Sequence, residues 1–226
     1  MPTARTPRPA PTSGATTHSE SRNQTLSTPV SSGKPARIRG SVSAYRTKFA
    51  NYITGFATGQ NRDSDGTLNA AGEFREFRFR QAPARFAGLE AEARFRLLER
   101  PGTLYLEVKA DSVSATNLAT GEPLPRIPAG RVGAALNYAA DGWSVKLETT
   151  RTAAQTRVPA GDNPSDGYTL WNAYGSYKLN LGGTRVLAWL KATNLTNREA
   201  RLATSVLRDT LPLGGRALQA GIRVDF

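Results

Sequence analysis

Hydrophobic and polar residues alternate along most of this chain. The alternation is strict in residues 89–97 (LEAEARFRL) and 103–111 (TLYLEVKAD), and it returns in residues 216–226, where the chain ends on Phe226. A period of two places successive side chains on opposite faces of a β-strand. These segments therefore predict strands with one apolar and one polar face.

The same pattern predicts eight antiparallel strands. They cover residues 41–54, 73–98, 103–111, 131–139, 143–150, 167–180, 184–195 and 216–226. Short turns at 99–102, 140–142 and 180–183 alternate with longer loops at 55–72, 114–128, 158–166 and 196–215. An up-and-down meander with short turns on one rim and long loops on the other is typical of a transmembrane β-barrel. The fold class is therefore all-β, an antiparallel up-and-down segment of such a barrel.

The alternation also assigns individual side chains to the two faces. The residues expected to face lipid are Leu104, Leu106, Val108, Val145, Leu147 and Val224. Those expected to face the lumen are Glu90, Glu92, Glu107, Lys109 and Lys146. Four aromatic residues, Tyr138, Trp143, Tyr177 and Phe226, fall near the short-turn rim, where membrane barrels place an aromatic girdle.

Composition narrows the choice of class. Only 38% of the 226 residues are hydrophobic, and no apolar run approaches the length of a membrane-spanning helix. The chain has no Cys, hence no disulfide or thiolate metal site. A net charge of +12 raises the possibility of nucleic-acid binding. The cations are spread singly, however, so scattered solvated charge is favoured. Excess positive charge could also face anionic lipid heads or an anionic ligand.

Residues 1–36 differ from the rest of the chain. They are rich in Pro, Ser, Thr and Ala, and we expect them to be disordered and unrelated to the barrel region, residues 37–226. No apolar stretch follows Met1, so we expect no signal peptide in this chain. His18, the only His, lies in this segment. We therefore expect no catalytic, cofactor-binding or metal site, and no enzyme activity.

Several motifs of the second half resemble the C-terminal part of the barrel of TonB-dependent outer-membrane receptors. They are PLPRIPAGRVGAALNY (123–138), WSVKLETTRTAAQTRV (143–158), DGYTLWNAYGSYKL (166–179), LKATNLTNREAR (190–201) and GGRALQAGIRVDF (214–226). Upstream, residues 79–97 resemble a descending strand of the same family. The resemblance extends over about residues 41–226.

This resemblance implies a 22-stranded barrel with a plug domain, which imports a scarce ligand such as a ferric siderophore, haem, vitamin B12 or zinc. It further implies location in the outer membrane of a Gram-negative cell, lipid contact, and recognition of the strand ending at Phe226 by the barrel-assembly machinery. The TonB complex would act only on an intact parent carrying a plug. With about eight strands and no plug, the chain is expected to be a C-terminal fragment that does not transport alone.

Two alternatives belong to other classes. One is a self-contained eight-stranded outer-membrane barrel with a structural or adhesive role, because eight strands can close. The other is a soluble basic β-protein that binds nucleic acid, although no nucleic-acid partner is expected. The sequence does not identify the small-molecule or metal-chelate ligand.

Overall fold

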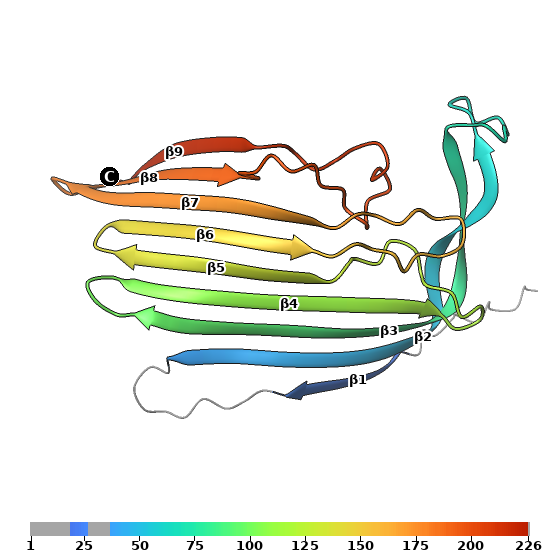
Figure 1. Cartoon of the computed structure of the whole chain (residues 1–226), viewed down its shortest axis with the longest axis horizontal. Coiled ribbons are helices and arrows are strands. Elements are labelled where there is room, and N and C mark those ends of the chain that lie inside the picture. Colours follow the sequence, from blue (N-terminus) through green and yellow to red (C-terminus); the bar gives the residue numbers. More distant parts are fainter. Residues whose placement is uncertain (1–18, 27–36, 226) are drawn as a thin grey trace, which may run out of the picture.

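The chain forms one antiparallel sheet of nine strands, each paired with its neighbours in sequence order (Figure 1). The structure is a computed structural model that describes residues 19–26 and 37–225. The strands are β1 (Ser19–Leu26), β2 (Ile38–Arg62), β3 (Phe74–Leu98), β4 (Thr103–Asn117), β5 (Arg131–Ala140), β6 (Trp143–Thr152), β7 (Tyr168–Leu181), β8 (Thr184–Thr193) and β9 (Ala217–Asp225). No helix long and apolar enough to cross a membrane occurs among these residues.

The eight predicted strands correspond to β2–β9, and the up-and-down order is confirmed. The short turns between β3 and β4, β5 and β6, and β7 and β8 lie together at one end of the sheet (Figure 1). The long loops 63–73, 118–130, 153–167 and 194–216 lie toward the other end. Gly142, Gly182 and Gly183 have positive φ in the two tightest turns, a conformation that Gly adopts at little steric cost.

One strand lies where disorder was predicted. Within residues 1–36, Ser19–Leu26 form β1, which pairs with β2 from Ser19 opposite Phe49 to Leu26 opposite Val42. The prediction was wrong here because composition reports side-chain burial, whereas an edge strand is held by main-chain hydrogen bonds. The rest of that segment, residues 1–18 and 27–36, lies outside the described residues.

Two strands are longer than predicted. β2 runs to Arg62, so the predicted loop 55–72 shrinks to 63–73. A β-bulge between Phe49 and Tyr52 shifts the register of β2 against β3. A bulge inserts one extra residue, which exchanges the faces of all later side chains. This explains why the hydrophobic pattern of β2 is irregular in the sequence. β4 likewise continues to Asn117.

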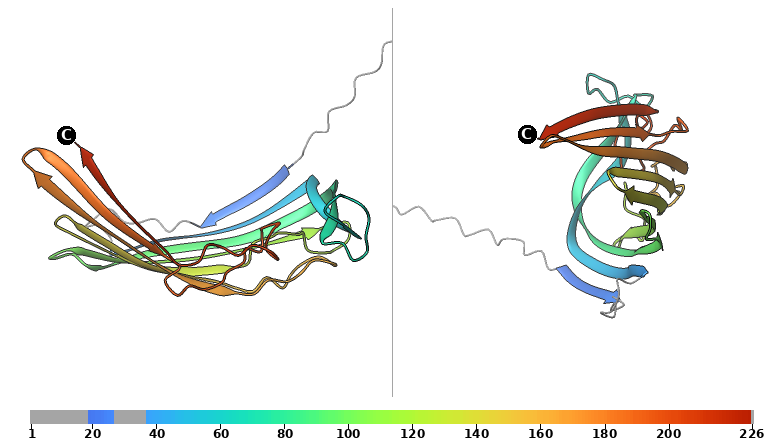
Figure 2. Two further views of the ribbon diagram at one scale, coloured as in Figure 1. Left: turned by 90° about the horizontal axis from the view of Figure 1, so that it is seen from above. Right: turned by 90° about the vertical axis from the view of Figure 1, so that its left-hand side faces the viewer.

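The strand register separates two chemically different faces. On one face, Leu106 lies opposite Leu136, which lies opposite Leu147. The adjacent row on the other face joins Arg94 to Glu107. The sheet curves like part of a cylinder wall (Figure 2). We call the first the apolar face and the second the polar face.

Few large side chains are fully buried, and the apolar face stays open. Its exposed members, each more than 40% accessible, include Leu89, Val132, Val145, Leu147, Leu190, Leu218, Ile222 and Val224. A soluble monomer rarely exposes a contiguous apolar surface of this extent. An exposed apolar surface of this kind is typical of a face that contacts lipid or another protein.

Candidate functional site

The polar face is hollowed, so it is the concave side of the sheet. One hollow is lined by polar-face residues of β4, β5 and β6, namely Glu107, Lys109, Asp111, Arg131, Lys146 and Glu148. A second, toward β2, is lined by Ser41, Ser43, Glu90, Glu92, Lys109 and Asp111. All five residues predicted to face the lumen thus lie along two adjoining hollows of one face.

Charges on the polar face are arranged in cross-strand and same-strand pairs. Arg131 lies 3.1 Å from Asp111 and Arg94 lies 3.4 Å from Glu107. These pairs are partly exposed, so each contributes at most about 1 kcal/mol to stability. Their main effect is to line the hollow with both signs of charge at fixed positions.

Three side chains hold the Glu148 carboxylate on this face. Lys146 lies 2.5 Å from it, and the Asn172 amide and the Tyr174 hydroxyl each donate a hydrogen bond of 3.0 Å. Side chains of two strands, β6 and β7, therefore converge on one carboxylate. A carboxylate that accepts hydrogen bonds from neighbouring strands in this way holds these strands in a fixed local geometry.

Glu90 and Glu92 occupy alternate positions of β3, as predicted. The Ser41 hydroxyl donates a 3.4 Å hydrogen bond to Glu92, and Asp111 lies opposite Glu90. This hollow is therefore more acidic than its neighbour. Within the described part of the chain, no three His, Cys, Asp or Glu side chains are grouped so that they could hold a metal ion.

The residues predicted to face lipid all share the opposite, apolar face. Leu104, Leu106 and Val108 are half-buried, while Val145, Leu147 and Val224 are exposed. None lies in a sealed interior. Contact with lipid stays a prediction, and Phe226 lies outside the described residues.

Aromatic residues gather at the short-turn end of the apolar face. The Trp143 and Tyr177 rings have centroids 4.4 Å apart. Tyr138 packs over Gly102, where a Cβ would lie 2.6 Å from the Tyr138 hydroxyl oxygen. Three of the four predicted rim aromatics are thus near the predicted end.

The β4–β5 loop does not extend freely but folds back onto the polar face. Leu124, only 2% exposed, packs between Ala84 of β3 and Ala115 of β4. Phe49 and Phe86 pack against the same cluster, with ring centroids 5.5 Å apart. The loop therefore covers the inner side of the wall near the long-loop end.

The β6–β7 loop clamps this folded segment. The Gln155 amide donates to the Ile127 carbonyl at 2.9 Å, and Arg157 donates to the Ala115 carbonyl at 3.0 Å. The sequence predicts both segments as long loops and does not reveal this small core. Its only sequence signal is Leu124 between two prolines, which marks an apolar side chain in an otherwise polar loop.

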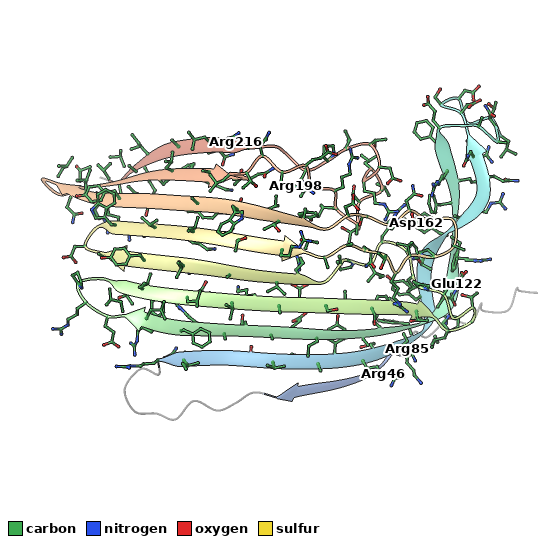
Figure 3. All side chains as sticks on the ribbon, viewed as in Figure 1. Arg46, Arg85, Glu122, Asp162, Arg198 and Arg216 are labelled. Atoms are coloured by element: carbon green, nitrogen blue, oxygen red, sulfur yellow. The ribbon has the colours of Figure 1, made fainter. Side chains whose placement is uncertain are left out.

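The β6–β7 and β8–β9 loops are joined by a buried ion pair between Arg208 and Asp162. Arg208 is 5% exposed. The Asn163 amide donates to Asp209 at 3.2 Å, and Arg75 of β3 donates to the Gly161 carbonyl at 2.5 Å. Two loops and the start of β3, distant in sequence, thus form one connected rim (Figure 3, around the Asp162 label).

A curved meander with one polar concave face, one exposed apolar face, and short turns opposite long loops is the wall of a transmembrane β-barrel. The family profile "TonB dependent receptor-like, beta-barrel" matches residues 20–196. The chain belongs to this family of TonB-dependent receptors. The match begins within β1, ahead of the expected boundary at residue 37.

The solved structures include a similar fold. The chain matches one described as "Copper transporter OprC" with a TM-score of 0.66 and 16% sequence identity. The match covers 84% of this chain and 29% of that chain, so this chain spans less than a third of the transporter's length. At this identity the likeness shows the fold alone. Comparison with curated proteins gave no match.

Proposed function

We propose that this chain forms part of the wall of an outer-membrane receptor that imports a scarce ligand. The observation that carries the proposal is the two-faced sheet: polar charges line its hollows, while large apolar side chains remain exposed on the other side. In a bilayer the exposed side contacts hydrocarbon and the hollow side faces water. Membership of the receptor family supports the same assignment.

The ligand would be a ferric siderophore, haem, a metal ion or a similar small molecule. Loops 118–130, 153–167 and 194–216 would meet it first, and polar-face residues such as Glu107 and Lys146 would shape the field below them. The match to a protein described as a copper transporter is compatible with a metal ligand. We propose binding and translocation, with no chemical conversion of the ligand.

Transport would need more than the described sheet. β1 and β9 are its two outer strands and do not pair with each other. Backbone polar groups at a strand edge in hydrocarbon need partners, so β1 and β9 are expected to pair with further strands in the receptor and with other copies of this chain when it is refolded alone in vesicles. We therefore propose that further strands, an inner plug and the TonB complex complete the functional receptor, and that the assembly machinery recognises β9. A closed barrel of eight strands from this chain alone is not supported by this pairing.

Membrane insertion can be tested on the purified chain. After refolding into phosphatidylcholine vesicles, we expect it to float with the lipid and to resist trypsin at strand sites such as Lys146 and Arg185. Cleavage is expected at rim sites such as Arg198. A chain that stays soluble, or that is cut equally at strand and loop sites, would overturn the assignment. Restored uptake of a ferric chelate by this chain alone, in a receptor-deficient strain, would overturn the requirement for further strands.

A further inference from the structure

Three basic residues of the apolar face lie together toward one end of the sheet. Along β2 the outward series runs through Val42 and Ala44 to Arg46 and Lys48, and along β3 it runs from Leu89 through Ala87 to Arg85. The three cations lie on the same face as the apolar residues and on the side toward the long loops. Figure 3 labels Arg46 and Arg85 beside each other in that region.

These cations lie close to one another on β2 and β3. Lys48 lies directly opposite Arg85 in the register, and Arg46 is two positions from Lys48 on the same face. Like charges in such cross-strand positions destabilise a sheet. No ion pair joins any of the three to a carboxylate among the described side chains, and Arg46 and Lys48 are exposed.

Neighbouring elements add further positive charge. Arg157 donates a 2.7 Å hydrogen bond to the Thr116 hydroxyl, and Thr116 is the register partner of Arg85. The Arg157 guanidinium therefore adds a further cation near Arg85.

The apolar surface ends where the cations begin. On β4 the outward series changes from Leu104, Leu106, Val108 and Ala110 to the hydroxyl residues Ser112, Ser114 and Thr116. The last of these lies opposite Arg85. The hydroxyls and cations thus mark one boundary between a face suited to hydrocarbon and a face suited to water.

We propose that Arg46, Lys48 and Arg85 form a docking surface for the phosphorylated headgroups of the lipid leaflet on the long-loop side. Long cationic side chains at such a boundary place their stems on apolar surface and their charges among headgroups. The proposal rests on the proposed membrane location. Nucleic acid would also be attracted by positive charge, but the adjoining apolar face favours lipid.

The test compares vesicles of phosphatidylcholine alone with vesicles that also contain phosphatidic acid. The full chain is measured against the triple variant R46Q/K48Q/R85Q. The matched control is R39Q/K178Q/R185Q, which removes two Arg and one Lys from exposed positions toward the short-turn end. Circular dichroism verifies the β-sheet content of each variant, and R46K/R85K keeps the charge while changing the side chains.

We expect the full chain and the control to prefer the anionic vesicles. A basic side chain at an anionic lipid surface contributes about fivefold, so the triple variant should lose roughly a hundredfold in that preference. The charge-conserving variant should retain it. High salt should weaken the preference of the full chain, because it screens exposed charges.

Three results would overturn the proposal: no preference by the full chain, an unchanged preference in the triple variant, or an equal loss in the control. Competition by inorganic phosphate as strong as that by phosphatidic acid vesicles would identify a free-anion site instead. Displacement from the vesicles by duplex DNA would identify nucleic acid. Binding to neutral vesicles reports the apolar face separately, so a failed membrane assignment is distinguishable from a failed headgroup site.

Discussion

Two adjacent residues of β4 provide a direct test of which face meets lipid. Leu106 and Glu107 are neighbours in the chain but point to opposite faces of the sheet. Leu106 lies between Phe95 and Leu136, whereas Glu107 lies beside Arg94. The variants Leu106→Arg and Glu107→Arg introduce the same side chain at the same level of the wall.

The expected free-energy costs differ by environment. An arginine facing lipid costs about 2–4 kcal/mol at the bilayer midplane and less toward the interfaces. Leu106 is two positions from Leu104, the register partner of the rim residue Tyr138, so we expect a cost of about 1–3 kcal/mol, which changes the ratio of inserted to unfolded chain by roughly 5- to 150-fold. The variant Glu107→Arg removes the 3.4 Å ion pair between Glu107 and Arg94. The Arg94 side chain is 50% exposed and the Glu107 side chain is 29% exposed. Such a pair is worth at most about 1 kcal/mol, and water in the hollow screens the added repulsion.

The measurement is denaturant titration of the chain refolded in phosphatidylcholine vesicles, followed by the fluorescence of its three tryptophans, Trp143, Trp171 and Trp189. Leu106→Ala serves as a control for lost side-chain volume without charge. We expect Leu106→Arg to shift the unfolding midpoint far more than Glu107→Arg. Equal shifts, or a larger shift for Glu107→Arg, would refute the assignment of faces.

Three further predictions concern the packing of the wall and its loops. Gly88→Ala should destabilise the sheet by about 1–3 kcal/mol in the same titration, because a Cβ at this position overlaps the ring of Tyr45 on β2. Gly175→Ala is the control: it meets open space and should be neutral, and an equal cost for both would contradict the packing argument. Leu124→Ala should weaken the folded β4–β5 loop by about 2–4 kcal/mol, seen as faster amide exchange in residues 118–130; unchanged exchange would mean that the loop is held otherwise. Arg208→Met removes the ion-pair partner of the largely buried Asp162 carboxylate. It should lower the free energy of opening of loops 153–167 and 194–216 by about 3 kcal/mol, seen as faster cleavage of these loops by trypsin. The double variant Arg208→Met/Asp162→Leu should recover part of the lost loop stability, because it also removes the unpaired carboxylate. If the double variant is cleaved as fast as Arg208→Met, the lost stability comes from other contacts of Arg208.

Most of the strands could be predicted from the sequence because the two faces of the sheet differ in polarity. Where a strand meets apolar surroundings on one side and water on the other, the side-chain period appears directly in the sequence, as in residues 103–111. The alternation of short turns and long loops follows from the same segments. For the same reason, the sequence predicts that Glu107 and Leu106 lie on opposite faces of the sheet.

The sequence pattern was less informative where a side chain's surroundings are set by distant segments. The bulge after Phe49 exchanges the faces of β2 midway, so a period of two no longer holds across the strand. β1 is held by main-chain pairing, which its polar composition does not reveal. The burial of Leu124 depends on Ala84 and Ala115, and neither small residue signals an interior position by itself.

The net charge of +12 was interpreted as scattered solvated charge, and the structure distributes it unequally. On the polar face, cations such as Arg131 and Lys146 lie beside carboxylates, so this face carries both signs within short distances. On the apolar face, Arg46, Lys48 and Arg85 lie together at the long-loop boundary. Because charge on a lipid-facing strand is costly except near the interface, the position of these cations restricts where the hydrocarbon can end. If the proposed headgroup contact holds, the same restriction orients the wall, with the long loops on the side of these headgroups and the aromatic pair of Trp143 and Tyr177 at the opposite interface.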